Sequence, residues 1–206
     1  MGYYSVVVLD FETTGLSPDN GDRAIEVGAV LVQDNRITDR FQSLMNPGVR
    51  VSSFIAEYTG ITNQMLSGAP PAAEVMQQFA RFMGRHHLVA HNASFDRRFL
   101  DAELQRISLR RQQDFACSLL LSRRLNPDAP SHSLETLVRY KKLATNGVFH
   151  RALADAEMTA HLWIGMVSEL KKEHQIRSIP FELMQRLMKM TKRAVPDYLK
   201  RLALEQ

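Results

Sequence analysis

The sequence predicts an α/β fold in which helices cover the faces of a mixed β-sheet. Two observations lead to this class. Three strand-like stretches come first, separated only by a loop and a turn, which is typical of an antiparallel meander. Further strand-like stretches then alternate with amphipathic helical stretches, and this alternation adds strands to the same sheet with helices on its faces.

The N-terminal meander begins with the apolar run "VVVL" at residues 6–9. Residues 13–23, "TTGLSPDNGDR", are rich in Gly, Pro, Asp and Asn and form a loop. Two further strands follow at residues 24–32 and 36–45, and "QDN" between them predicts a hairpin turn.

The remaining elements are predicted from helical periodicity, short apolar runs and proline positions. Strands are expected at residues 87–91 and at the start of 114–125. Helices are expected at residues 70–84, 93–107, the rest of 114–125, 131–143, 151–173, 180–193 and 196–206.

Length and composition limit the classes of protein that fit. With 206 residues, 45% of them hydrophobic, the chain can form one sizeable core plus an appendage. We expect a domain over residues 1–172 and a basic helical extension over 173–206. The N-terminus lacks the features of a signal peptide, and no apolar stretch is long enough to cross a bilayer. The single cysteine, Cys117, excludes an internal disulfide, so we expect a cytoplasmic protein and a buried thiol.

The positive charge of the chain is concentrated in its tail. Residues 171–206 contain nine Lys or Arg and four Asp or Glu, whereas residues 1–170 contain 17 basic and 18 acidic residues. Two interpretations of the tail remain open at this point. It is either a solvated helix surface or a contact for a polyanion or a partner protein.

Two carboxylates stand side by side at the end of the first strand. Asp10 and Glu12 are two residues apart, and side chains at that spacing point to the same side of a strand. Like charges in such a place are unfavourable unless something neutralises them. Asp96 and Asp155 each lie near the start of a predicted helix, where an acid alone would be unremarkable.

Taken together, the segments that carry these acids resemble a known family. The segments "VVVLDFETTG", "LVAHNASFD" and "HRALADA" match, in order and spacing, the three blocks of the DEDDh (DnaQ-like) exonucleases. "YTGITNQML" and "HSLETL" are similar to segments between those blocks. The resemblance covers residues 6 to about 165 and leaves out the tail beyond about residue 170.

The resemblance implies a ribonuclease H-like fold with a five-stranded mixed sheet. It also implies that Asp10, Glu12, Asp96 and Asp155 bind two divalent cations, Mg²⁺ or Mn²⁺, which prefer oxygen ligands. We expect Asp10 to bridge both ions, Glu12 and Asp155 to complete one site, and Asp96 to hold the second ion. His150 would accept a proton from the attacking water, since histidine titrates near neutrality.

The activity implied is that of a hydrolase, a 3′–5′ exonuclease of replication or repair. It would cleave terminal phosphodiesters of single-stranded DNA or RNA with a free 3′ end and release 5′-mononucleotides. Less specific patterns suggest the substrate contacts. The expected contacts are Thr13, Thr14, Gly15, the apolar side chains of Leu16 and Ile61, Asn92 and Phe95. Four arginines, at 97, 98, 123 and 124, are either phosphate contacts or solvated residues.

Two other sequence patterns bear on the function. The histidines at 86, 87 and 91 fit no zinc spacing and have no cysteine partners, so we expect turn and strand-edge roles for them. The tail contains a Met- and Leu-rich stripe, and such a stripe more often packs a helix against its neighbours than forms a binding groove. Its residues are Leu183, Met184, Leu187, Met188 and Met190. The alternative to a free-standing enzyme is an interaction protein. It would be a proofreading or accessory subunit that docks on a DNA polymerase, or on a second copy of the chain, through the C-terminal helices.

Overall fold

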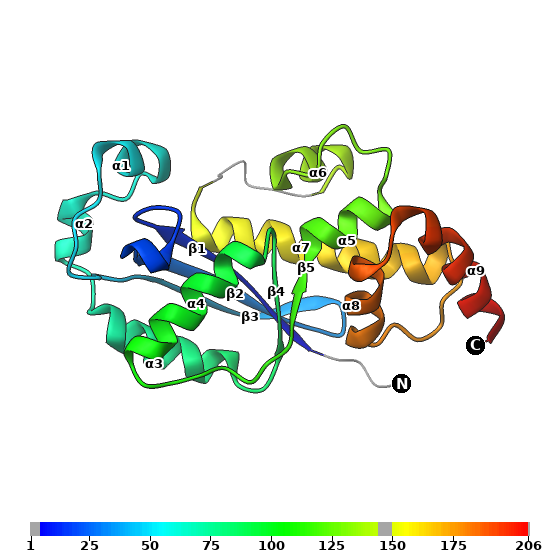
Figure 1. The fold of residues 1–206 in the computed structure, drawn as a ribbon, viewed down its shortest axis with the longest axis horizontal. Helices are drawn as coiled ribbons and strands as arrows, with labels where there is room; N and C mark the ends of the chain where they lie inside the picture. Colours follow the sequence, from blue (N-terminus) through cyan, green and yellow to red (C-terminus); the bar gives the residue numbers. More distant parts are fainter. Residues whose placement is uncertain (1–4, 144–149, 206) are drawn as a thin grey trace.

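Five strands form one sheet in the computed structural model, which describes residues 5–143 and 150–205 (Figure 1). Their order across the sheet is β3-β2-β1-β4-β5. Strands β1, β2 and β3 pair antiparallel, and β4 and β5 run parallel to β1. The mixed sheet predicted from the sequence is therefore confirmed. The strands are β1 (Val6–Thr13), β2 (Ala24–Gln33), β3 (Arg36–Leu44), β4 (His87–Ala90) and β5 (Phe115–Cys117).

Helices surround the sheet and follow most of the predicted ranges. They are α1 (Ser53–Thr59), α2 (Asn63–Ser67), α3 (Ala72–Met83), α4 (Ser94–Arg106), α5 (Ser118–Leu125), α6 (Leu134–Tyr140), α7 (Ala152–Lys172), α8 (Phe181–Lys189) and α9 (Val195–Glu205), with short 3₁₀ turns η1 (Pro18–Asn20) and η2 (Lys192–Ala194). The predicted β2–β3 turn has left-handed φ angles of 50° at Asp34 and 59° at Asn35, which two-residue hairpins favour.

The helices α1 and α2 were not among the predicted elements. Both are too short for a clear helical period, and each depends on an N-cap. The Ser52 hydroxyl accepts a hydrogen bond from Ile55 N, and the Thr62 hydroxyl accepts one from Met65 N. These caps are the local signal that could have located both helices.

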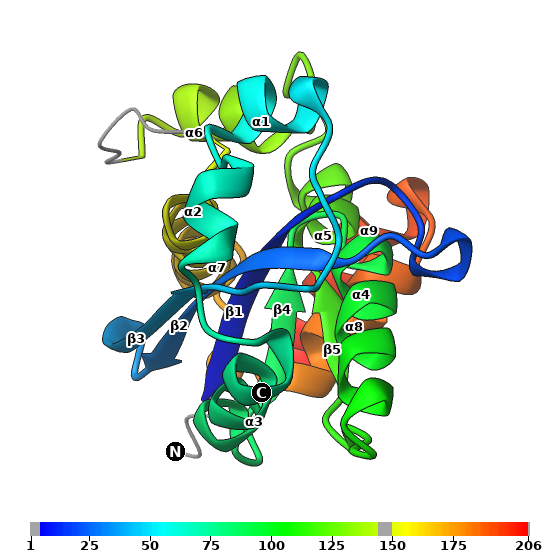
Figure 2. The same cartoon turned by 90° about the vertical axis from the view of Figure 1, so that its left-hand side faces the viewer.

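Alternation along β1 divides the core into two layers. Val6 and Val8 pack with α7 in one cluster, whereas Val7, Leu9 and Phe11 pack with α3 and α4 in another. Figure 2 shows α7 on one side of the sheet and α3 and α4 on the other. Asp10 and Glu12 continue the series of Val6 and Val8, so their side chains face α7.

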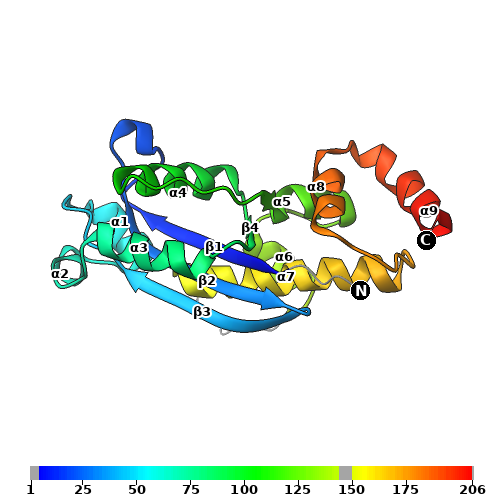
Figure 3. The ribbon, with the colours of Figure 1, turned by 90° about the horizontal axis from the view of Figure 1, so that it is seen from below.

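The C-terminal helices pack against the body of the protein. Phe181, Met184 and Leu187 of α8 are at most 1% exposed and lie in the same core cluster as Trp163 of α7. This burial confirms helix packing for the Met- and Leu-rich stripe. In Figure 3, α8 and α9 lie at the end of the molecule opposite α1 and α2. The proposed division at residue 172 stays a prediction. Among the described residues, no helix is both long and apolar enough to span a membrane.

Candidate active site

The acidic residues of β1 lie where this strand extends past its neighbour. Pairing with β4 reaches Val8, opposite Val89, and the residues after it on β1 have an open edge on that side. On the other side the pairing with β2 continues, with Asp10 opposite Gly28 and Glu12 opposite Glu26. The open edge gives room for other elements to approach the two carboxylates.

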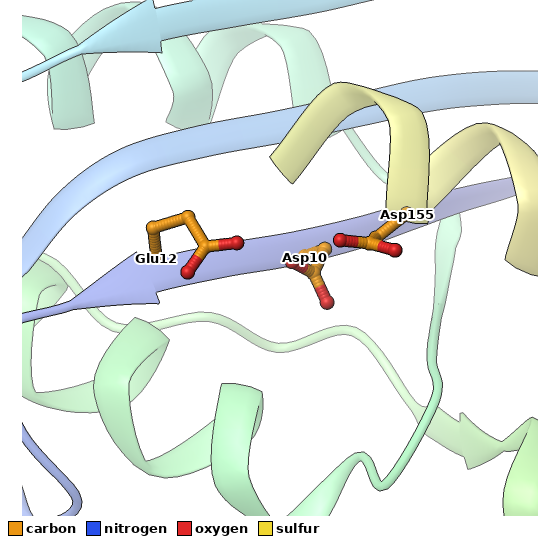
Figure 4. Close-up of side chains that lie close together, drawn as sticks. All are labelled: Asp10, Glu12 and Asp155. Atoms are coloured by element: carbon orange, nitrogen blue, oxygen red, sulfur yellow. The ribbon is translucent and has the colours of Figure 1, made fainter. Parts of the chain in front are cut away.

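Helix α7 supplies the third carboxylate. Asp155 lies in its first turn, and α7 packs across β1 and β2. One carboxylate oxygen from each of Asp10, Glu12 and Asp155 lies within 4.8 Å of the others. Figure 4 shows the three side chains turned toward one space between β1 and the start of α7. This spacing allows one cation to contact all three residues.

Asp96 reaches the same region from α4. It is 2% exposed, and its Oδ1 accepts a hydrogen bond of 3.2 Å from the backbone N–H of Phe11. It is not in the group of three within 4.8 Å, yet its charge raises the pKa of Asp10 and of Glu12. The structure thus places all four predicted acids together, with three in closest contact.

The electrostatics of the cluster favour protonation in the absence of a counter-charge. Burial and then the neighbouring carboxylates raise the pKa of Asp10 well above its usual range. Burial and the charge of Asp155 raise the pKa of Glu12 from 4.5 to about 8. Burial also raises the pKa of Asp155 to about 6, against the opposing effect of His150. A site with these properties suits divalent cations, which would stabilise the ionised carboxylates.

His150 lies next to the acid cluster, two residues before the start of α7. Its backbone N–H donates a hydrogen bond of 2.9 Å to Asp155 Oδ2, and its own φ is left-handed at 60°. The imidazole is exposed, and its ring centroid lies 4.2 Å from that of Tyr58 on α1. Residues 144–149, directly before His150, lie outside the described residues.

The loop after β1 carries the next predicted contacts. The Thr13 hydroxyl donates to the Gly15 carbonyl at 2.6 Å, and the Thr14 hydroxyl accepts from Arg23 N at 3.0 Å. A Cβ on Gly15 would lie 2.4 Å from Asp22 Oδ1, so a larger residue here would displace the Asp22 side chain, whose Oδ2 accepts from Ser17 N. Leu16 is 79% exposed, which leaves its side chain available to a ligand.

The other predicted substrate contacts differ in how exposed their side chains are. Ile61 is 0% exposed and packs in a small core cluster, so its side chain is not at the surface. Asn92 is exposed and has a left-handed φ of 63°. Phe95 is partly buried and contacts the Phe99 ring at a centroid distance of 4.9 Å.

Of the four arginines, two donate hydrogen bonds to backbone carbonyls, which limit their reach. Arg98 donates to the Leu16 carbonyl at 3.3 Å and Arg124 to the Met190 carbonyl at 2.6 Å. Arg97 and Arg123 are exposed and line a cavity between α4, β5 and α5.

The remaining predicted side chains lie at strand ends: His86, His87 and His91 have the expected turn and strand-edge positions around β4, and Cys117 ends β5. His91 contacts Ser118 Oγ and the His132 carbonyl, each at 2.9 Å, and burial lowers its pKa to about 4. His86 contacts Ser5 Oγ at 2.6 Å, and His87 stacks on Phe181. Cys117 is 8% exposed, as expected for a buried thiol.

Sequence reasoning missed three residues around the site. Tyr58 was missed because α1 was not predicted. Glu26 and Arg151 form an ion pair beside the acid cluster, with Arg151 Nη2 at 2.8 Å from Glu26 Oε1. A single acid within the apolar run "AIEVGAVLV" was the signal that could have revealed Glu26.

Comparisons with known proteins agree with this geometry. Residues 7–163 match the model of the RNase T family, described as exonuclease. The chain is 39% identical over 166 residues to a DNA polymerase III PolC-type of Caldanaerobacter subterraneus, and 40% identical over 169 residues to that of Thermotoga petrophila. Each match covers 81% of this chain and 12% of the relative, so the chain spans a small part of those polymerases.

Solved structures share the fold. Exonuclease X in complex with 5′-overhanging duplex DNA has a TM-score of 0.71 and 28% identity, over 89% of this chain and 99% of that one. The nuclease domain of 3′hExo, a DEDDh family member bound to rAMP, has a TM-score of 0.69 and 22% identity, over 81% and 93% of the two chains. At that lower identity the likeness concerns the fold.

Proposed function

Because the chain belongs to the RNase T exonuclease family, in its DEDDh branch, we propose that it is a metal-dependent 3′–5′ exonuclease. Its proposed substrate is single-stranded nucleic acid with a free 3′ end, and DNA is the preferred substrate over RNA. The products would be 5′-mononucleotides, released one at a time by phosphodiester hydrolysis.

The observation that carries this proposal is the group of three carboxylates within 4.8 Å of one another. Their raised pKa values mark a place where negative charge is unfavourable until a cation compensates it. Asp10, Glu12 and Asp155 would hold the first cation, and Asp96, beside them, would contribute to a second. Bound Mg²⁺ or Mn²⁺ would supply Lewis-acid stabilisation of charge on the phosphate oxygens.

The side chains around the cluster have proposed roles of their own. His150 accepts a proton from the attacking water, since its imidazole is exposed and its backbone N–H is hydrogen-bonded to Asp155. Thr13, Thr14 and Gly15 form a tight turn that orients the terminal nucleotide. Leu16 supports its base through an apolar contact, and Asn92 and Phe95 would add further contacts to the same nucleotide.

The similarity to PolC-type polymerases favours a second candidate function. In this alternative the chain acts as a proofreading or accessory subunit that docks on a polymerase through its C-terminal helices. The exposed basic residues of η2 and α9 would form the contact, namely Lys192, Arg193, Lys200 and Arg201.

One experiment separates these candidates. The purified chain is incubated with single-stranded DNA labelled at the 5′ end, with matched RNA, and with circular single-stranded DNA, in Mg²⁺, Mn²⁺ or EDTA. A ladder shortened from the 3′ end, intact circles and no cleavage in EDTA are expected. Cleavage of circles would contradict an exonuclease, and full activity in EDTA would contradict the cation site. Activity that appears only after a polymerase is added would support the alternative.

A further inference from the structure

Two residues of strand β2, Glu26 and Gly28, contact the start of α7 beside the acid cluster. We call this contact the α7 seat. We infer that Glu26 and Gly28 are positioning residues, which set where His150 and Asp155 lie relative to Asp10 and Glu12. The effect of the seat on catalysis rests on the proposed function. The seat itself is defined by contacts within the protein.

Gly28 allows the α7 backbone to approach the sheet closely. A Cβ at this position would lie 2.0 Å from Leu153 N and 2.2 Å from the Ala152 carbonyl carbon. Both are backbone atoms, so no side-chain rotation could relieve the clash. Any larger residue would therefore move the first turn of α7 away from β2. Because Gly28 pairs directly with Asp10, that movement would take Asp155 away from Asp10.

Glu26 accepts four hydrogen bonds, three from the start of α7 and one from Gln42 of β3. Its Oε2 accepts from Arg151 Nε at 3.2 Å and from Ala152 N at 3.1 Å. Its Oε1 accepts from Arg151 Nη2 at 2.8 Å and from Gln42 Nε2 at 2.9 Å. Glu26 is 0% exposed, and these bonds involve both of its carboxylate oxygens. A carboxylate used in this way holds neighbouring groups and is not free to act as a further cation ligand.

The contact between Glu26 and Arg151 is connected to the acid cluster through two hydrogen bonds. Arg151 is the residue that follows His150, and its carbonyl accepts the backbone N–H of Asp155 at 3.0 Å. The N–H of His150 in turn donates to the Asp155 carboxylate. Fixing Arg151 therefore fixes both the proposed base and one proposed cation ligand. Residues that orient ligands in this way commonly change metal affinity or activity by about 10–100-fold when they are replaced.

Four variants test the seat. Glu26→Gln keeps the shape but removes the charge, and Arg151→Met removes the partner. Arg151→Lys restores the positive charge without the two-pronged geometry. Glu103→Gln is the matched control, because Glu103 is also buried, accepts from Ala24 N, and pairs with Arg23 at 2.7 Å, away from α7. Thermal unfolding of each variant is measured first, so that loss of fold is distinguished from loss of position.

Three readouts are compared with wild type: Mn²⁺ binding by electron paramagnetic resonance, kcat against KM on single-stranded DNA, and amide hydrogen exchange of residues 150–158 without metal. We expect Glu26→Gln and Arg151→Met to weaken Mn²⁺ binding and lower kcat by about 10–100-fold, with KM changed little. Exchange at the start of α7 should accelerate in both. Arg151→Lys should recover part of the loss, and Glu103→Gln should leave Mn²⁺ binding and α7 exchange unchanged.

The exchange and Mn²⁺ readouts do not require nuclease activity. If the wild-type chain cleaves nothing, the proposed function fails while the seat is still judged by those two measurements. Wild-type exchange and Mn²⁺ affinity in folded Glu26→Gln and Arg151→Met would overturn the inference. If Glu103→Gln produced the same losses, they would reflect general destabilisation, and the inference would also be overturned.

Discussion

The Tyr58 ring lies against the His150 imidazole, with 4.2 Å between the ring centroids and 40° between their planes. Phe54, one turn earlier on α1, stacks on Tyr58 at a centroid distance of 6.1 Å. Phe54 is 70% exposed and Tyr58 is 52% exposed, although both are large and apolar. Phe54, Tyr58 and the proposed base His150 therefore form an exposed row of rings.

We predict that Tyr58→Ala lowers kcat whereas Tyr58→Phe does not. The ring contact restrains the imidazole, and such contacts contribute about 0.5–1.5 kcal/mol, equivalent to no more than roughly tenfold in rate. Steady-state kinetics on a single-stranded oligonucleotide would show this difference. Equal kcat values for the two variants would exclude the ring contact as a support for His150.

His150→Ala should lower kcat by roughly 10²–10⁴-fold, the usual effect of removing a positioned general base. Mn²⁺ binding should persist, because the hydrogen bond to Asp155 comes from the backbone N–H and remains in the variant. His150→Asn is the matched variant, since asparagine tolerates the left-handed φ of 60° better than alanine.

The measurement is the pH–rate profile of both variants beside wild type at saturating Mn²⁺. The carboxylates titrate as well, so the wild-type profile alone does not identify the base. A rate close to wild type for both variants at every pH would remove His150 from the mechanism.

The metal-free protein should lose stability as the pH rises toward 8. Glu12 has a pKa of about 8 when folded, against an ordinary value of 4.5, so the folded state binds the proton more tightly. That contribution to stability is present below about pH 4.5 and is lost as the pH rises through about 8. Glu12→Gln, which cannot ionise, should therefore melt above wild type at pH 8 and approach it near pH 5.

Thermal melts in EDTA would measure this difference, at about 2–4 °C for each kcal/mol of relieved repulsion. Saturating Mn²⁺ should reverse the order at pH 8, because only wild type keeps the Glu12 ligand. A difference between variant and wild type that stays constant from pH 5 to 8 would refute the raised pKa that burial and the neighbouring carboxylates give Glu12. Glu26→Gln is unsuitable as a control, since it also breaks the α7 seat.

Phe181→Ala should destabilise the protein by roughly 3–5 kcal/mol, because it removes a buried ring from the core. The ring is 1% exposed and contacts both His87 and Trp163. Leu204→Ala is the control, since Leu204 is 89% exposed and should cost less than about 0.5 kcal/mol. Urea unfolding compares the two variants. Equal stability for both would show that α8 packs on the core more weakly than its burial indicates.

Deletion of residues 175–206 should expose the same core. Loss of activity in that truncated chain would not by itself identify a role for the basic tail. Reversal of the exposed charges at Lys192, Arg193 and Lys200 is the sharper test of polyanion binding. It should weaken binding to single-stranded DNA and reduce the salt dependence of the affinity. Unchanged affinity and salt dependence would show that these residues are a solvated surface.

Local sequence patterns were enough to predict the sheet and the pairing of Asp10 with Glu12. The convergence of Asp96 and Asp155 with the acids of β1 was implied by the family resemblance, whereas alternation on β1 placed Asp10 and Glu12 on one side. Such patterns depend on neighbouring residues, so they are readable without coordinates. The helices α1 and α2 were missed because caps, rather than periodicity, define them.

Only the tertiary structure decided which distant side chains meet. The Glu26–Arg151 pair joins residues 125 apart in the sequence, and Tyr58 contacts His150 although neither segment predicts the other. Ile61, which was expected beside a base, is fully buried, and Phe181 of the C-terminal helices lies in the same core cluster as Trp163 of α7. The physical reason is that burial and pairing depend on how elements pack, whereas periodicity specifies only which face of each element is apolar.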